Sequence, residues 1–509
     1  MRRHTVEARE RAVQLLLEAD PGGRGRRAAS ERIARRTGVG AAQLRRWAAQ
    51  HELSHRTGGP PAAPAGRSTT GRRGPAPSLT LVRGAALAGL VTAGASPLLA
   101  FPVTATTAMV AGLLPVWLPH LGRWRGARLV SVLGVAAVLG GLVLQVTGTH
   151  DTSQRVATAT IVHLLSAVGL FGFVLWTRSV LPVWLIAVAY GGGILVNGAL
   201  DSAASPNPWK YELGLAVTTI VLALAQSTRR SLPPAVAVLA LGVVWAAQDT
   251  RSALGISVLT AVVVLWQAVP RRSAVGRTGW SRLAQVGLLA AASYGVYALA
   301  TSLLTSGLLG VTLQQRSAAQ VAQGNGSLLV GARPELTASL ALLADTPAGF
   351  GPGAVPERGD VMIAKAAMAQ VGISPDNGYV DEYMFGGHFE LHSVLADAWV
   401  NFGWAGAAFV IALTCVLLNA LLMRFAARTA SAVLTFWSLY SLWWIGFGPL
   451  YTNLPDVAFT LGIAVVAAVP RTRTRPQAPR PPLPAGRHAA VDAGPGPLTP
   501  GGRGRPGPR

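Results

Sequence analysis

Long apolar segments dominate this sequence and constrain its fold more than any other feature. A helix needs about twenty mostly apolar residues to cross the hydrocarbon core of a bilayer, and such segments recur between residues 79 and 469. Only 13% of the residues are charged, well below the proportion in soluble domains. We therefore predict an all-α polytopic membrane protein of about twelve transmembrane helices, with these approximate bounds: 79–99, 103–119, 127–147, 156–176, 180–200, 210–227, 231–247, 252–269, 283–303, 403–423, 431–450 and 453–469.

The distribution of basic residues orients these predicted spans. If residues 1–78 are cytoplasmic, the connections on the cytoplasmic side carry twelve arginines. The short outer connections carry only Arg155, Lys210 and Arg251. Because cytoplasmic loops of membrane proteins carry an excess of Lys and Arg, we predict a multi-pass protein of the cytoplasmic membrane with both termini in the cytoplasm.

Composition also divides the chain into segments. Between the ninth and tenth predicted spans lies a large loop with four basic and eight acidic residues, which the parity of the spans places outside the cytoplasm. Long structured loops are usually functional. The predicted parts are a basic segment (1–56), a flexible linker (57–78), transmembrane helices 1–9 (79–303), the extracytoplasmic loop (304–391), transmembrane helices 10–12 (392–470) and a disordered basic tail (471–509).

The N-terminal segment has a pattern of its own. The formal net charge is +23, and most of it lies in the two tails. Residues 4–52 read as helix, glycine-containing turn and basic helix, and they resemble the helix-turn-helix segment of insertion-sequence transposases. That resemblance implies that Arg45 and Arg46, on the helix Ala41–Gln50, contact nucleic acid. A basic appendage without a DNA role, and a fusion or a start codon placed too far upstream, remain open as alternatives.

Metal and disulfide chemistry find little support in the sequence. Cys415 is the only cysteine, so no disulfide can form within the chain, and we predict that it is a small buried residue. His388 and His392 are four residues apart, a spacing that can place two metal ligands on one helix face. No third ligand is evident, so we expect neither a metal nor another cofactor.

Three polar places on the predicted outer side are candidates for function, because charged residues beside membrane helices are costly. Arg251 stands at a helix end in "QDTRSALG". Arg333 opens a helix-like segment that ends in a glycine-rich turn, and His392 stands where the loop returns to the membrane. Taken singly, each also fits a structural role: an arginine reaching the interface, a solvated loop arginine, a structural histidine.

Together the three places resemble, in order and spacing, the O-antigen ligase and O-antigen polymerase superfamily over roughly residues 80–470. The matching residues are Thr250-Arg251-Ser252, Arg333, Pro347, Gly349, Gly351, Gly353, His392, Ser393, Leu395, Gly403 and Gly406. Two features depart from that pattern. Thr250 replaces the more usual Ser, and Glu335, Leu336 and Thr337 fill the places where an aromatic residue is often found.

The resemblance implies a metal-independent, inverting membrane glycosyltransferase that takes a glycan from a polyprenyl-diphosphate carrier. In that interpretation His392 is catalytic, Arg251 and Arg333 bind the diphosphate, and the five matched glycines support the loop. The residue types suit these roles, because arginine matches phosphate oxygens and histidine has an unperturbed pKa of about 6.5. The partners would be the lipid-linked donor, a glycan or lipid acceptor, and membrane lipid; ligase and polymerase are not separated.

Two other classes of protein remain open. A transporter or flippase of lipid-linked glycans would also be polytopic, although transporters tend to place polar residues at mid-membrane in repeated halves. No clear internal repeat is evident in this chain, and its polar cluster lies at the outer mouth. A membrane-tethered DNA-binding regulator would make the N-terminal segment the functional part.

Overall fold

The computed structural model of the protein describes residues 15–16, 26–37, 41, 44, 78–228, 232–268, 282–307, 311–324, 326–328, 331 and 333–468. The chain divides into two units, Met1–Ala76 and Pro77–Arg509. In the first unit helix α2 (Arg26–Thr37) is described. The predicted DNA contacts Arg45 and Arg46, nearly all of the linker 57–78 and the whole tail 471–509 lie outside the described residues.

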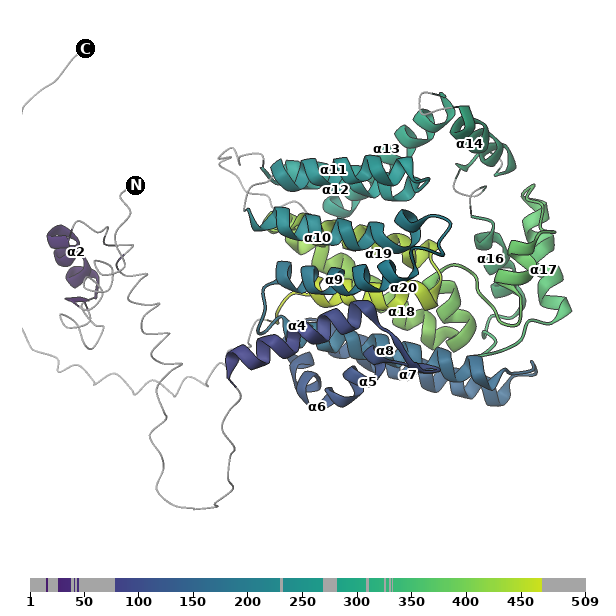
Figure 1. Cartoon of the computed structure of the whole chain (residues 1–509), viewed down its shortest axis with the longest axis horizontal. Coiled ribbons are helices and arrows are strands. Elements are labelled where there is room, and N and C mark those ends of the chain that lie inside the picture. Colours follow the sequence, from purple (N-terminus) through teal and green to yellow (C-terminus); the bar gives the residue numbers. More distant parts are fainter. Residues whose placement is uncertain are drawn as a thin grey trace, which may run out of the picture. The chain divides into compact units, whose positions relative to one another are not determined.

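The second unit is predominantly helical, with one two-stranded antiparallel sheet. Its first part runs from the start of the predicted spans to the large loop (Figure 1). The elements are α4 (Leu79–Ala95), β1 (Leu98–Ala100), β2 (Val103–Thr104), α5 (Ala105–Gly112), α6 (Leu114–Trp117), the 3₁₀ helix η1 (Leu118–Arg123), α7 (Ala127–Thr147), α8 (Gln154–Thr177), α9 (Val183–Asp201), the π-helical turn η2 (Trp209–Leu213), α10 (Gly214–Ser227), α11 (Leu232–Ala247), α12 (Arg251–Ala268) and α13 (Arg282–Thr305).

The large loop is itself helical, and the described residues after it, up to 468, form three further helices. In Figure 1 the loop helices α14, α16 and α17 gather at one end of the bundle, beyond the tips of the long helices. The remaining elements are α14 (Val311–Gln323), α16 (Glu335–Asp345), α17 (Arg358–Gln370), the π-helical turn η3 (Tyr379–Met384), α18 (Val394–Ala427), α19 (Ala432–Phe447) and α20 (Leu450–Ala464).

Helix length and composition indicate a membrane protein. Among the described residues, four helices are long and apolar enough to cross a bilayer: α7, α8, α9 and α18. Helices α4, α11, α12 and α19 are apolar but shorter. The protein is therefore a predominantly helical polytopic membrane protein. The number of twelve spans stays a prediction.

Three predictions about the apolar segments need correction. The predicted span 103–119 is no continuous helix, because α5 ends at Gly112 and two new short helices follow, with Pro115 and Pro119 in their first turns. The helix predicted over 403–423 begins nine residues earlier, and Gly403 is non-helical within it. Cys415 is exposed rather than buried, since it shares the outward face of α18 with Ile411 four residues before.

Packing centres on α18. This helix lies against α7, α19 and α20, while α8 packs on α20 and α4 on α9. The loop has a second apolar core, in which α16 and α17 pack against each other and against the start of α18. Its buried members include Leu342, Met368, Phe389 and Trp399. The loop is thus fixed on the end of the bundle by apolar burial, the main stabilising contribution in folding.

The segments that connect the helices contact one another in two groups, one at each end of the bundle. At the end with the loop, Ser153 N donates to Gly353 O at 2.8 Å, and Asn207 Nδ2 donates to Gln248 O at 3.1 Å. At the other end, Arg125 N donates to Val466 O at 3.0 Å. The same end holds hydrogen bonds from Arg178 to Val465 O, from Arg424 to Ala464 O and from Gln267 to Ala430 O.

Candidate functional site

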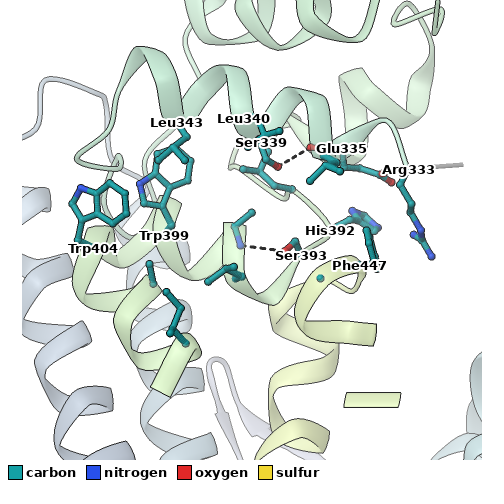
Figure 2. Close-up of a pocket in the computed structure, with 17 residues that line it drawn as sticks. Arg333, Glu335, Ser339, Leu340, Leu343, His392, Ser393, Trp399, Trp404 and Phe447 are labelled. Atoms are coloured by element: carbon teal, nitrogen blue, oxygen red, sulfur yellow. Dashed lines mark hydrogen bonds between the residues drawn. The ribbon is translucent and has the colours of Figure 1, made fainter. Parts of the chain in front are cut away.

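A cavity of about 220 Å³ lies between α16, the first part of α18 and the end of α19. One end of it is polar and the other apolar. Figure 2 shows Arg333, Glu335 and His392 toward one end and Trp399 and Trp404 toward the other. Two apolar stripes at helical spacing form the walls: Leu336, Leu340 and Leu343 on α16, and Trp404, Ala407 and Ile411 on α18.

Arg333 lies just before α16 at the polar end. Its guanidinium carbon is 5.4 Å from the ring centroid of Trp443 and 5.9 Å from that of Phe447, both on α19. In the part of the chain that the structure describes, no carboxylate lies within ion-pair distance of this guanidinium. Arginine stacked on aromatic rings keeps its charge and its donors, so Arg333, at the edge of the cavity, carries a cation that no acid of the described residues neutralises.

Glu335, the first residue of α16, is a buried acid beside this cation. Its Oε1 accepts a hydrogen bond from the Tyr379 hydroxyl, whereas its buried Oε2 has no partner among the described residues. Burial, and then the charge of Glu335, raise the pKa of the Tyr379 hydroxyl, so this group remains a donor. From the sequence, Glu335 was noted only as a departure from the family pattern. Its place as a buried acid in the cavity was not predicted.

His392 is held in an uncommon conformation between the loop and α18. Its φ is +50°, in the left-handed region. Its ring lies 5.4 Å from that of Tyr379, and its Nδ1 is 3.8 Å from Glu390 Oε1. This Nδ1 is buried without a hydrogen-bond partner among the described residues. Glu390 also lies 3.4 Å from His388, so its carboxylate stands between the two histidines.

Two short side chains hold the backbone on either side of His392. Ser393 caps α18 by accepting from Ala396 N at 3.2 Å, and it donates to Ile445 O at 3.0 Å. Asp397, buried in α18, accepts from Leu391 N at 2.6 Å and from Leu450 N at 2.9 Å. Sequence reasoning missed Asp397, although an acid inside an apolar run is a signal of a specific role.

The two predicted glycine motifs meet beside Trp399, which lines the cavity. Gly349, Gly351 and Gly353 all have positive φ, and the turn they form bonds to α18 through Phe350 N and Gly351 N, which donate to Val400 O. A Cβ on Gly349 would lie 2.5 Å from Trp399 O. Gly403 breaks the helical conformation of α18, and a Cβ there would lie 2.6 Å from Ala348 O.

Gly406 completes this contact from the far side of the kink. A Cβ on it would collide with the carbonyl oxygen of Ala398, which lies before the kink. The kink therefore requires glycine at 403 and at 406, and it sets the direction of the α18 segment that carries Trp404.

Arg251 is placed elsewhere. It begins α12, and its Nη1 donates to Ser317 Oγ at 2.9 Å and to Gln320 Oε1 at 3.2 Å, both on α14. It does not line the cavity. The structure thus brings Arg333 and His392 to one cavity and the two glycine motifs together beside it, but it does not bring Arg251 into the same site.

Comparisons of the chain with models of protein families, with curated proteins and with solved structures found no match. The resemblance to the O-antigen ligase and polymerase superfamily therefore stays a prediction from the order and spacing of the sequence motifs. No group of three His, Cys, Asp or Glu side chains is placed to hold a metal ion in the described ranges.

Proposed function

We propose that this protein is an O-antigen ligase- or polymerase-like glycosyltransferase of the cytoplasmic membrane. It would transfer a glycan from a polyprenyl-diphosphate carrier to an acceptor hydroxyl at the outer face, in surface polysaccharide synthesis. One observation carries the proposal: Arg333 and His392, which come from separate motifs of the resemblance, line the same cavity.

Arg333 suits the departing lipid diphosphate. A diphosphate is a good leaving group once its charge is neutralised, and arginine offers a permanently charged, planar set of donors that matches phosphate oxygens. Its guanidinium has no acidic partner within the described residues. The resemblance supplies a second diphosphate-binding residue, Arg251, which would reach the substrate only outside this cavity, because its side chain is bonded to α14.

His392 suits the acceptor. The bond between the acceptor oxygen and the anomeric carbon forms while the bond from that carbon to the diphosphate oxygen breaks. The hydroxyl proton passes to His392, and the lipid diphosphate leaves with its electron pair beside Arg333. With Nδ1 facing Glu390, Nε2 is the nitrogen that we assign to the acceptor.

The apolar end of the cavity suits the carrier chain. Trp404 is 60% exposed, Leu340 57% and Ile411 52%, so this end opens at the outer surface of the helices. In a bilayer such a surface faces lipid, and a polyprenyl chain lying there would place its diphosphate toward Arg333. The proposed outer location of the cavity depends on the prediction of twelve spans. The grouping of alternate connections at opposite ends of the bundle supports that prediction.

Deletion of the gene, followed by glycan analysis, tests the proposal. Single repeat units on the lipid carrier at the outer face would indicate a polymerase, and long lipid-linked chains would indicate a ligase. Unchanged surface glycans would contradict both. Complementation with the full-length parent protein should restore the parent pattern.

One observation favours a transporter of lipid-linked glycans as a second candidate. Asp456, within α20, accepts a hydrogen bond from the Tyr190 hydroxyl of α9 at 2.8 Å. Ionisable residues inside membrane helices often mark transport pathways. If this candidate is correct, the deletion strain accumulates lipid-linked units at the cytoplasmic face, where intact cells protect them from added glycosidases.

A further inference from the structure

Glu335 has an oxygen that the fold does not use. The residue is only 6% exposed and lines the cavity. Tyr379 satisfies Oε1, while Oε2 is buried without a partner in the described part of the chain. A buried acceptor left without a donor is costly, and such groups in native proteins call for a specific explanation.

Structural roles do not account for this oxygen. Arg333, two residues away, stacks on Trp443 and Phe447 instead of pairing with Glu335. The Ser339 hydroxyl bonds to the Glu335 backbone carbonyl, not to its carboxylate. A first-turn acid is favoured by the helix dipole, but that effect does not require burial or an unpaired oxygen.

The polar end of the cavity therefore presents one cation and one anion that do not pair with each other. Figure 2 shows Glu335 and His392 near each other, with the Arg333 side chain directed away from both. Phosphate oxygens are attracted to Arg333 and repelled by the Glu335 carboxylate. A hydroxyl or an amino group has the opposite preference, because it donates a hydrogen bond.

We propose that Glu335 binds the acceptor, with Oε2 accepting a hydrogen bond from a hydroxyl or amino group of the sugar that receives the glycan. This inference rests on the proposed function. Tyr379 is the positioning residue, because its hydroxyl holds Oε1 and its ring lies against His392. Glu335 and His392 then contact the acceptor, and Arg333 contacts the donor.

Transfer kinetics with the full-length protein in proteoliposomes test this assignment. The donor is the lipid-linked glycan that accumulates in the deletion strain, and the acceptor is the glycan fraction of the same strain. Glu335→Gln retains an acceptor for the Tyr379 hydroxyl but removes the charge. We expect it to raise the acceptor KM about ten- to hundredfold and Tyr379→Phe to raise it about three- to tenfold, with the donor KM unchanged in both. Glu382→Gln, an exposed acid of the same loop, is the matched control and should match the parent.

Mild N-acetylation of the acceptor distinguishes the two kinds of donor group. If an amino group binds Glu335, N-acetylated acceptor loses the difference between the parent and Glu335→Gln; if a hydroxyl binds, the difference persists. An unchanged acceptor KM in Glu335→Gln, or a raised donor KM, would overturn the assignment while leaving the function intact. Absence of transfer by the parent protein would overturn both.

Melting of the proteins without substrate separates binding from folding. Removing a buried, half-paired charge should leave the melting temperature of Glu335→Gln equal to or above that of the parent. A clear decrease in melting temperature would show that Glu335 serves the fold and would overturn its assignment to the acceptor.

Discussion

At the scale of single residues, His392 is restrained on several sides before any substrate binds. Its left-handed backbone, the neighbouring Ser393 cap and the ring of Tyr379 fix its position. Such restraint is expected where a side chain must meet a reacting group within a narrow geometry. Replacement of His392 is therefore an informative test of the mechanism.

Replacement of His392 by Ala should lower the rate of transfer about 10²–10⁴-fold, the usual contribution of a positioned acid or base. The protein should still insert into membranes and elute as a single species from a sizing column. His388→Ala is the matched control, because His388 also faces Glu390 but does not line the cavity. If folded His392→Ala transfers glycan at the parent rate, His392 is not catalytic.

The sequence singled out Arg333 and His392 as candidates because each belongs to a local motif with its own spacing, and the structure places both at one cavity. It could not predict the place of Arg251, which depends on where α14 docks, a contact between segments far apart in the chain. Glu335 was missed for a related reason. Its burial and its unpaired oxygen arise only when α16 packs over α18 and Tyr379 closes on it.

At the scale of elements, the kink in α18 joins the loop to the bundle. Gly403 has φ 60° and ψ −152°, a combination open almost only to glycine. Gly403→Ala should therefore lower the free energy of unfolding by about 1–3 kcal/mol and reduce transfer, since the cavity walls move apart. Chemical denaturation in mixed micelles measures the first effect.

The control for this substitution is Gly192→Ala in α9. A Cβ there meets no atom within 4 Å, and alanine is the better helix former by about 1 kcal/mol. We expect Gly192→Ala to be neutral or stabilising. Equal stability of Gly403→Ala and the parent would mean that the kink is not required by the fold.

Arg251 joins α14 to the start of α12 through hydrogen bonds to Ser317 and Gln320. Besides the two hydrogen bonds from Arg251, the Arg316 guanidinium pairs with Asp249 at 2.6 Å. Arg251→Ala should therefore speed amide hydrogen exchange across Val311–Gln323 about tenfold, because the helix detaches more often. Arg155→Ala, which removes a basic residue in the first turn of α8, should not change it. Unaltered exchange in Arg251→Ala would show that α14 is held by other contacts.

The elements that the sequence predicted well are long, uniformly apolar and bounded by turns. Predicted span 127–147 coincides with α7, and 156–176 lies within α8. The prediction of one helix over 103–119 was wrong. The segment is mostly apolar, but Pro115 and Pro119 divide it into short helices. The meeting of the Gly349 turn with Gly403 is a tertiary contact, so local composition predicts each motif but not their proximity.

At the scale of the whole molecule, the connections between helices lie at two opposite ends of the bundle. We therefore predict that the two ends face opposite sides of the membrane. Ala203 and Asp345 are exposed at the end that holds the loop, and Ser227 and Thr429 are exposed at the opposite end. In a background where Cys415 is replaced by Ala, A203C and D345C should react with a membrane-impermeant maleimide in intact cells. S227C and T429C should react only after permeabilisation, because the bilayer excludes the charged reagent.

This labelling pattern bears directly on the site. Arg333 and His392 lie at the loop end, so a glycan donor that has crossed the membrane can reach them only if that end faces outward. Labelling of S227C and T429C in intact cells, with A203C and D345C protected, would place the cavity on the cytoplasmic side and remove the outer-face transfer from consideration. Labelling of residues from both ends in intact cells would contradict the parity of twelve spans. The positive-inside rule favours the outward loop, since Arg178 and Arg424 lie together at the end opposite it, where they donate to the carbonyls of Val465 and Ala464 at the end of α20.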